Sequence, residues 1–138
     1  MSEKLNIIGL KNVVGALNDA IDIYTHCSSE NHALLNTLRS GLIQNFEIAY
    51  EMSWKFMKRW LEINISPDIV LGLSRKEFYR IARENLLITD VEKWWSFHEA
   101  RNKTSYVYDE IIADKTVETA IEFLPYAMDF ISKLEEKV

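Results

Sequence analysis

One long stretch of helical periodicity constrains the fold of this chain more than any other feature. From about residue 31 to residue 63, apolar side chains recur at steps of three and four positions with no proline between them. A helix of this length runs for roughly 50 Å at about 1.5 Å per residue. Its apolar side chains form two stripes, one with Leu42, Phe46 and Phe56 and the other with Tyr50, Trp54 and Leu61. Either both stripes are enclosed within one chain, or the second stripe contacts another subunit.

The rest of the chain also carries helical patterns. Apolar periodicity predicts a helix from about residue 3 to 25 and another from Asp114, its expected N-cap, to about residue 137. Only four Gly and two Pro are available for turns, and the hairpin dipeptides Asn-Gly and Asp-Gly are absent. We therefore expect an all-α protein, an up-and-down four-helix bundle with additional short helices, that forms a single domain over residues 1–138.

Local signals predict where the shorter helices begin. Ser74 with Glu77, and Thr89 with Glu92, are capping boxes that open two short helices. Pro125 lies inside the last predicted helix, where it removes one N–H donor and predicts a kink or a break.

Charge and composition narrow the classes of function. A net charge of −5 and a pI near 5.2 argue against broad, non-specific nucleic-acid binding, which needs a contiguous basic surface. Basic residues do concentrate in the middle of the chain, among them Lys58 and Arg75. We expect most of them to pair with nearby glutamates at helical spacings.

The sequence shows no membrane span, metal site or cofactor motif. No segment approaches the roughly 18 apolar residues that cross a bilayer, and no secretory signal is visible, so we expect a cytoplasmic protein that does not bind membranes. The single Cys27 is consistent with a reducing compartment. His26 and His32 have no further ligands at metal-binding spacing.

The densest polar chemistry lies between residues 101 and 108, in the run RNKTSYVY. On a continuous helix, Arg101, Ser105 and Tyr108 would share one face as a guanidinium, a hydroxyl and a phenol, which suits phosphate binding. Asn102 and Tyr106 would lie on a second stripe, rotated by about 100°. The alternative interpretation is a solvated helix rim with aromatic anchors.

Resemblance to a known protein family rests on three stretches: GLIQNFEIAYEMSWKFMKRWLE at 41–62, ARENLLITDVEKWW at 82–95 and RNKTSYVYDE at 101–110. The chain is similar to the nucleotidyltransferase substrate-binding proteins, also described as HepT-like or HEPN, which are small helical partners of a minimal nucleotidyltransferase. The resemblance covers nearly the whole chain. It implies a homodimer whose subunits enclose the polar motif in a cleft, where nucleotide or RNA can bind.

The family motif, as this resemblance implies it, reads Arg, four residues, His, one residue, Tyr. Arg101 and Tyr108 match it, whereas Tyr106 occupies the position of the His. In family members that act as toxin ribonucleases, the Arg holds phosphate and the His moves protons. A phenol with a pKa near about 10 stays protonated at neutral pH and is a poor general base. His98, three residues before Arg101, is the candidate replacement.

Two functions from different classes remain open. The first is a non-catalytic, substrate-binding subunit of a minimal nucleotidyltransferase encoded nearby. In this case Asn102, Ser105 and Tyr108 form the binding set, and Tyr108, by resemblance, accepts AMP from the partner. The second is a metal-independent HEPN endoribonuclease toxin of a toxin–antitoxin pair, regulated by AMP transfer to tyrosine, with Arg101 and Tyr106 at the catalytic positions. A helical scaffold without a ligand is a third interpretation.

Overall fold

The structure is a computed structural model that describes residues 5–138, and within that range it is entirely helical. Its elements are α1 (Ile8–His26), α2 (His32–Asn64), α3 (Arg75–Glu84), α4 (Val91–Asn102), the short 3₁₀ helix η1 (Thr104–Tyr106) and α5 (Glu110–Lys137). The predicted all-α class is confirmed. No helix within residues 5–138 has both the length and the apolar character that crossing a bilayer would require.

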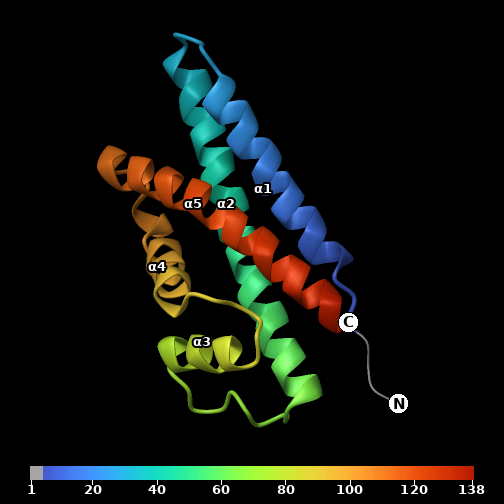
Figure 1. The fold of residues 1–138 in the computed structure, drawn as a ribbon. Helices are drawn as coiled ribbons and strands as arrows, with labels where there is room; N and C mark the ends of the chain where they lie inside the picture. Colours follow the sequence, from blue (N-terminus) through green and yellow to red (C-terminus); the bar gives the residue numbers. More distant parts are fainter. Residues whose placement is uncertain (1–4) are drawn as a thin grey trace.

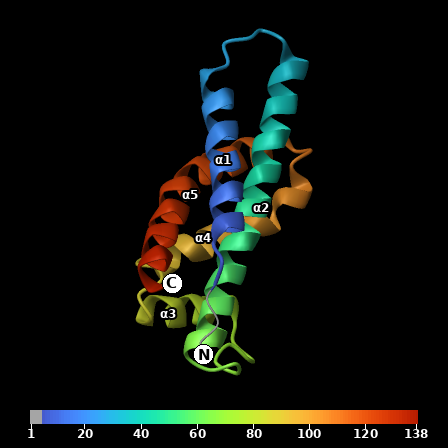
Figure 2. The ribbon, with the colours of Figure 1, turned by 90° about the vertical axis from the view of Figure 1, so that its right-hand side faces the viewer.

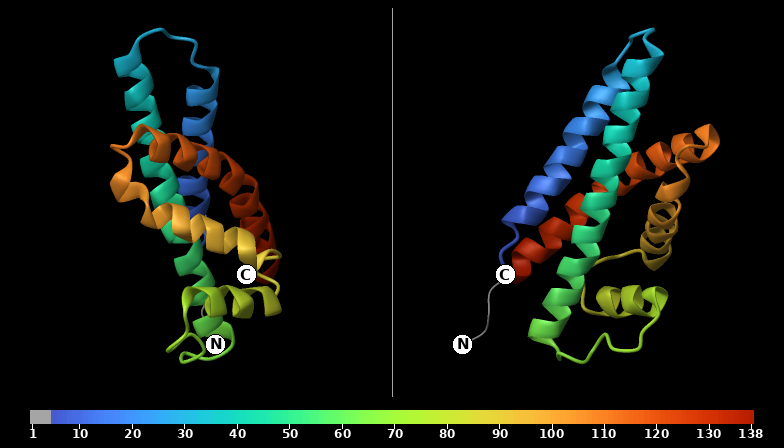
Figure 3. Two further views of the ribbon diagram at one scale, coloured as in Figure 1. Left: turned by 90° about the vertical axis from the view of Figure 1, so that its left-hand side faces the viewer. Right: turned by 180° about the vertical axis from the view of Figure 1, so that it is seen from behind.

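Four of these helices run alternately up and down. The antiparallel pair α1 and α2 forms a long hairpin, and its connecting end extends beyond the rest of the molecule (Figure 1). Helix α5 crosses this hairpin obliquely and packs on both α1 and α2 (Figure 2). Helix α4 packs on both α2 and α5, with α3 next to it at the lower end of α2 (Figure 3). Helix α3 and η1 are the additional short helices of the predicted bundle.

Helix starts follow local capping chemistry, with two corrections. The predicted box at α3 is present, because the Ser74 hydroxyl accepts a hydrogen bond from the backbone N–H of Glu77 at 3.2 Å. Helix α4 is capped by Asp90, one residue after the predicted Thr89, through a 3.0 Å bond from the backbone N–H of Lys93. A carboxylate is a strong cap, and here it takes the place of the neighbouring hydroxyl.

Two predicted boundaries of the long helices were wrong. Helix α5 begins at Glu110, where Asp109 rather than Asp114 accepts hydrogen bonds from two backbone N–H groups. The additional turn buries Ala113, which favours the earlier start. Of the kink or break predicted at Pro125, the break is absent, because α5 continues through it with Phe123 and Ala127 on either side both buried in the core. At the other end, α1 begins at Ile8 rather than near residue 3, and residues 3 and 4 lie outside the described range.

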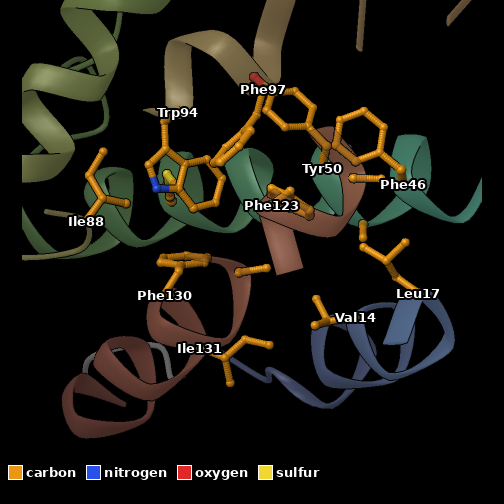
Figure 4. Packing of buried hydrophobic residues seen from close by; sticks show 14 of the residues in the cluster. Val14, Leu17, Phe46, Tyr50, Ile88, Trp94, Phe97, Phe123, Phe130 and Ile131 are labelled. Atoms are coloured by element: carbon orange, nitrogen blue, oxygen red, sulfur yellow. The ribbon is translucent and has the colours of Figure 1, made fainter. Parts of the chain in front are cut away.

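The core is a cluster of aromatic rings at the crossing of α2, α4 and α5. Phe123 of α5 lies between α2 and α4, with its ring centroid 5.4 Å from Phe46, 5.5 Å from Trp94 and 5.2 Å from Phe97 (Figure 4). These contacts are edge-to-face, the arrangement that the ring quadrupoles favour. The crossing of three helices is therefore fixed by large, fully buried side chains.

Both apolar stripes of α2 are covered by other helices of the same chain. Phe46 from the first stripe and Tyr50 and Leu61 from the second are fully buried. Trp54 is half-buried and packs edge-to-face on Phe78 of α3, with ring centroids 5.9 Å apart. The second stripe is thus covered by α3 and α4, without any requirement for another subunit.

Candidate functional site

The polar motif lies at the junction between α4 and α5 and is not one continuous helix. Helix α4 ends at Asn102, η1 covers residues 104 to 106, and α5 starts at Glu110. At this break the backbone N–H groups of Lys103 and Tyr106 bond to carbonyls three residues back, and the buried hydroxyl of Thr104 donates to the carbonyl of Arg101 at 2.8 Å. The predicted single helical faces, with Arg101, Ser105 and Tyr108 on one and Asn102 and Tyr106 on the other, are therefore wrong.

Arg101 faces α2 and is held by two carboxylates. Its NH1 lies 3.5 Å from Glu47 Oε2 and donates to the Thr104 hydroxyl at 3.0 Å. Its Nε is 3.4 Å from Glu51 Oε1, but this buried atom is not aligned for a hydrogen bond. The side chain is 31% exposed, so an incoming phosphate would compete with both glutamates for the same guanidinium.

The tyrosines of the motif point into solvent. Tyr106 is 52% exposed and Tyr108 83% exposed, and their ring centroids lie 6.4 Å apart. Ser105 is exposed as well. Within residues 5–138, neither phenol forms a hydrogen bond, and the Arg101 guanidinium makes no cation–π contact with Tyr108. Both phenol oxygens are thus accessible to a second protein.

His98 and Asn102 belong to a different face of α4 from the two tyrosines. The Nδ1 of His98 lies 3.3 Å from NH1 of Arg75, and its Nε2 lies 3.2 Å from the side-chain amide of Asn102. Arginine can only donate, so Nδ1 must be the acceptor and the proton of the neutral ring is on Nε2. The side-chain nitrogen Nδ2 of Asn102 lies at Nε2, and turning that amide brings its oxygen into position to accept from the ring N–H. Burial, and next the positive charge of Arg75, lower the pKa of His98 below its ordinary value of 6.5.

Arg75 is a second arginine in this region that sequence reasoning did not place in the site. Its NH1 donates to the hydroxyl of Tyr50 at 2.9 Å, and its guanidinium carbon lies 3.8 Å from the ring centroid of Trp54. The hydroxyls of Tyr50 and Tyr79 are hydrogen-bonded to each other inside the core. Burial raises the pKa of Tyr50 to about 12. The only signal in the sequence was the group of basic residues in the middle of the chain.

These side chains form one continuous polar cluster. The indole N–H of Trp54 donates to Glu51 Oε2 at 3.1 Å, and Glu51 also lies against Arg101. We call the following residues of α2, α3 and α4 the polar cluster: Glu47, Tyr50, Glu51, Trp54, Arg75, Tyr79, His98, Arg101 and Asn102. It brings together two of the five predicted site residues, Arg101 and Asn102, and leaves Ser105, Tyr106 and Tyr108 outside.

Two hollows adjoin α4 and α3. One, of about 380 Å³, lies between α4 and α5 and includes Ser96, Lys103 and Lys115 in its lining. The other, of about 200 Å³, lies beside Arg75 between α2 and α3. Within the described range, no group of three His, Cys, Asp or Glu side chains is placed to hold a metal ion.

The fold and the site together define a small all-α bundle, with a partly buried polar cluster on one side of α4 and two exposed tyrosines at its end. The chain belongs to the family described as nucleotidyltransferase substrate binding protein like, whose family model matches residues 5–136. This match confirms the family resemblance.

Individual relatives agree with that assignment. A Haemophilus influenzae protein described as a probable ribonuclease HepT is 34% identical over 103 residues, which cover 74% of this chain and 70% of that protein. A solved structure from the same species, described as the fold of a substrate binding domain of a nucleotidyltransferase, has a TM-score of 0.84 at 29% identity and covers 94% of this chain and 99% of that one. A Thermus thermophilus structure, with a TM-score of 0.72 at 19% identity over 91% of this chain and 98% of that one, shares the fold.

Proposed function

We propose that this chain is the non-catalytic, substrate-binding subunit of a separate minimal nucleotidyltransferase encoded nearby. The main support for this proposal comes from two features of the motif. Arg101 is paired with the carboxylates of Glu47 and Glu51, and position 106 is a tyrosine rather than a histidine. Such a motif is poorly equipped for proton transfer. The family and the similar structure described as a nucleotidyltransferase substrate-binding domain support a role in binding.

The exposed phenol of Tyr108 is the proposed acceptor of AMP. In this step the phenol oxygen attacks the α-phosphorus of ATP bound by the partner, the bond from that phosphorus to the β-phosphate bridging oxygen breaks, and pyrophosphate leaves while the phenol proton goes to solvent or a partner base. The product is an anionic phosphodiester on Tyr108. Its charge can pair with Arg101 only by displacing Glu47 or Glu51, so modification would rearrange the polar cluster. The 83% exposure of Tyr108 supports its access to a second enzyme.

We further propose that two copies of this chain form a homodimer whose cleft contains both motifs. Under this proposal Arg101, Asn102 and Ser105 contribute to binding nucleotide or RNA, and Tyr108 lies at the edge of the cleft. Exposed apolar side chains near the motif, such as Ile111 at 69% exposure, support a protein contact there.

Co-purification tests the partnership directly. The chain and the neighbouring nucleotidyltransferase would be expressed together, and the nucleotidyltransferase alone would carry the affinity tag. We expect a complex of fixed stoichiometry by size-exclusion chromatography with light scattering. Recovery of the tagged protein without this chain, when both are soluble and folded, would contradict the proposal.

The alternative function is a metal-independent endoribonuclease, favoured by the description of the relative as a probable ribonuclease. His98 would then have to replace the missing imidazole. Its Nδ1 lone pair already accepts from Arg75, so the ring has no free basic nitrogen. We therefore expect the purified chain not to cleave RNA in the presence of a chelator. Cleavage that is lost in Arg101→Ala, with an unchanged circular dichroism spectrum, would support the alternative instead.

A further inference from the structure

The hollow of about 200 Å³ between α2 and α3 is lined by cationic and aromatic side chains. Trp54 and Lys58 of α2 face Arg75 and Phe78 of α3 across it, and the other lining residues are Val70, Leu73 and Ser74. No carboxylate is among these described lining residues. The hollow therefore presents two positive charges to whatever enters it.

Arg75 is held in place before any ligand arrives. Its guanidinium stacks on the indole of Trp54 at 3.8 Å and donates through NH1 to the buried hydroxyl of Tyr50. Trp54 is itself fixed by its hydrogen bond to Glu51 and by its edge-to-face contact with Phe78. The hydroxyl of Tyr79 also accepts a hydrogen bond from this guanidinium, and the N–H groups that these partners do not use are oriented toward an acceptor.

The described residues do not neutralise the charges of this hollow. We expected the basic residues here to pair with glutamates at helical spacings, but within residues 5–138 neither Arg75 nor Lys58 forms an ion pair with a carboxylate. Glu51 pairs with Arg101 instead. A half-buried guanidinium without a counter-ion is costly, and an anionic ligand would offset that cost.

We propose that this hollow binds a phosphate group, with Arg75 as its fixed donor and Lys58 as a second, mobile cation. Its volume of about 200 Å³ is below the roughly 300 Å³ at which sites for larger organic ligands begin, so it suits a compact oxyanion rather than a whole nucleotide. A planar guanidinium and an ammonium are the side chains that bind phosphate best.

This site is separate from the exposed tyrosines but connected to the motif. Arg75 contacts His98, and Trp54 reaches Arg101 through Glu51. A phosphate bound at Arg75 would therefore change the surroundings of both His98 and Arg101. The inference goes beyond the proposed partnership and does not require that Tyr108 be modified.

A titration followed by nuclear magnetic resonance tests this site. Inorganic phosphate and, separately, AMP would be added to the full chain at low ionic strength, and the indole N–H signal of Trp54, assigned by its loss in Trp54→Phe, would be followed. We expect a saturable shift of this signal. Lys58→Met and Arg75→Gln should each weaken binding at least about tenfold, as the loss of a charge-assisted contact implies.

Lys55→Met is the matched control, because Lys55 is exposed one turn earlier on α2 and does not line the hollow. It should bind like the wild type. If Arg75→Gln fails to fold, since Arg75 also contacts Tyr50, then Lys58→Met alone decides the result. Binding of inorganic phosphate, with or without binding of AMP, supports the proposal, whereas binding of AMP alone would contradict a site for a compact oxyanion. No shift with either probe, or equal affinity in Lys58→Met and the wild type, would overturn the proposal.

Discussion

At the scale of single residues, buried ionisable groups determine how the fold responds to pH. Tyr50 is fully buried, and its pKa is raised from 10.0 to about 12, first by burial. A raised folded-state pKa means that the folded chain keeps its proton after the unfolded chain has lost it. The stability due to the neutral phenol is therefore complete below pH 10 and is lost as the pH rises toward 12.

We predict that the free energy of unfolding falls by on the order of 2 to 3 kcal/mol between pH 10 and pH 12 because of Tyr50. Urea unfolding at a series of pH values measures this fall. Tyr50→Phe is the reference, since it lacks the titrating hydroxyl and should show a shallower decline, although it is less stable at neutral pH through the lost bond to Arg75. If the free energy of unfolding falls equally steeply with pH in both proteins, then Tyr50 does not cause the loss of stability at alkaline pH.

At the scale of helices, sequence reasoning succeeded where the signal was local and failed where two signals competed. The Ser74 box was found because cap and partner are three residues apart. The start of α5 was misplaced because Asp109 and Asp114 are both suitable caps, and only burial of Ala113 separates them. The break at 103–109 was missed because this segment contains no glycine or proline to mark it.

The two aspartates of this region provide a matched pair of substitutions. Asp109→Ala should destabilise the protein by about 0.5 to 2 kcal/mol, because it removes the acceptor for two backbone N–H groups. Asp114→Ala should cost less than about 1 kcal/mol, because it removes only an exposed carboxylate that pairs with Arg39. Thermal unfolding of both variants makes the comparison. A larger loss for Asp114→Ala would mean that α5 is capped where the periodicity first predicted.

At the scale of the whole molecule, the bundle class was predictable and the site was not. Long apolar periodicities and scarce turn residues were sufficient to predict helices packed on helices. The polar cluster joins Tyr50, Arg75 and His98 from three helices far apart in sequence, and no spacing rule relates them. The predicted site residues divide because Arg101 on α4 faces α2, whereas Tyr108 follows the break after Asn102 and lies in solvent.

The intact mass of this chain, after it is purified together with its neighbouring nucleotidyltransferase and incubated with ATP, tests the central proposal most directly. We predict a complex in which this chain gains one or more AMP units, with the same gain in Tyr106→Phe and none in Tyr108→Phe. Peptide mapping locates the modified residue. Failure to form any complex, or an unchanged mass of the wild-type chain within an active complex, would contradict the proposal.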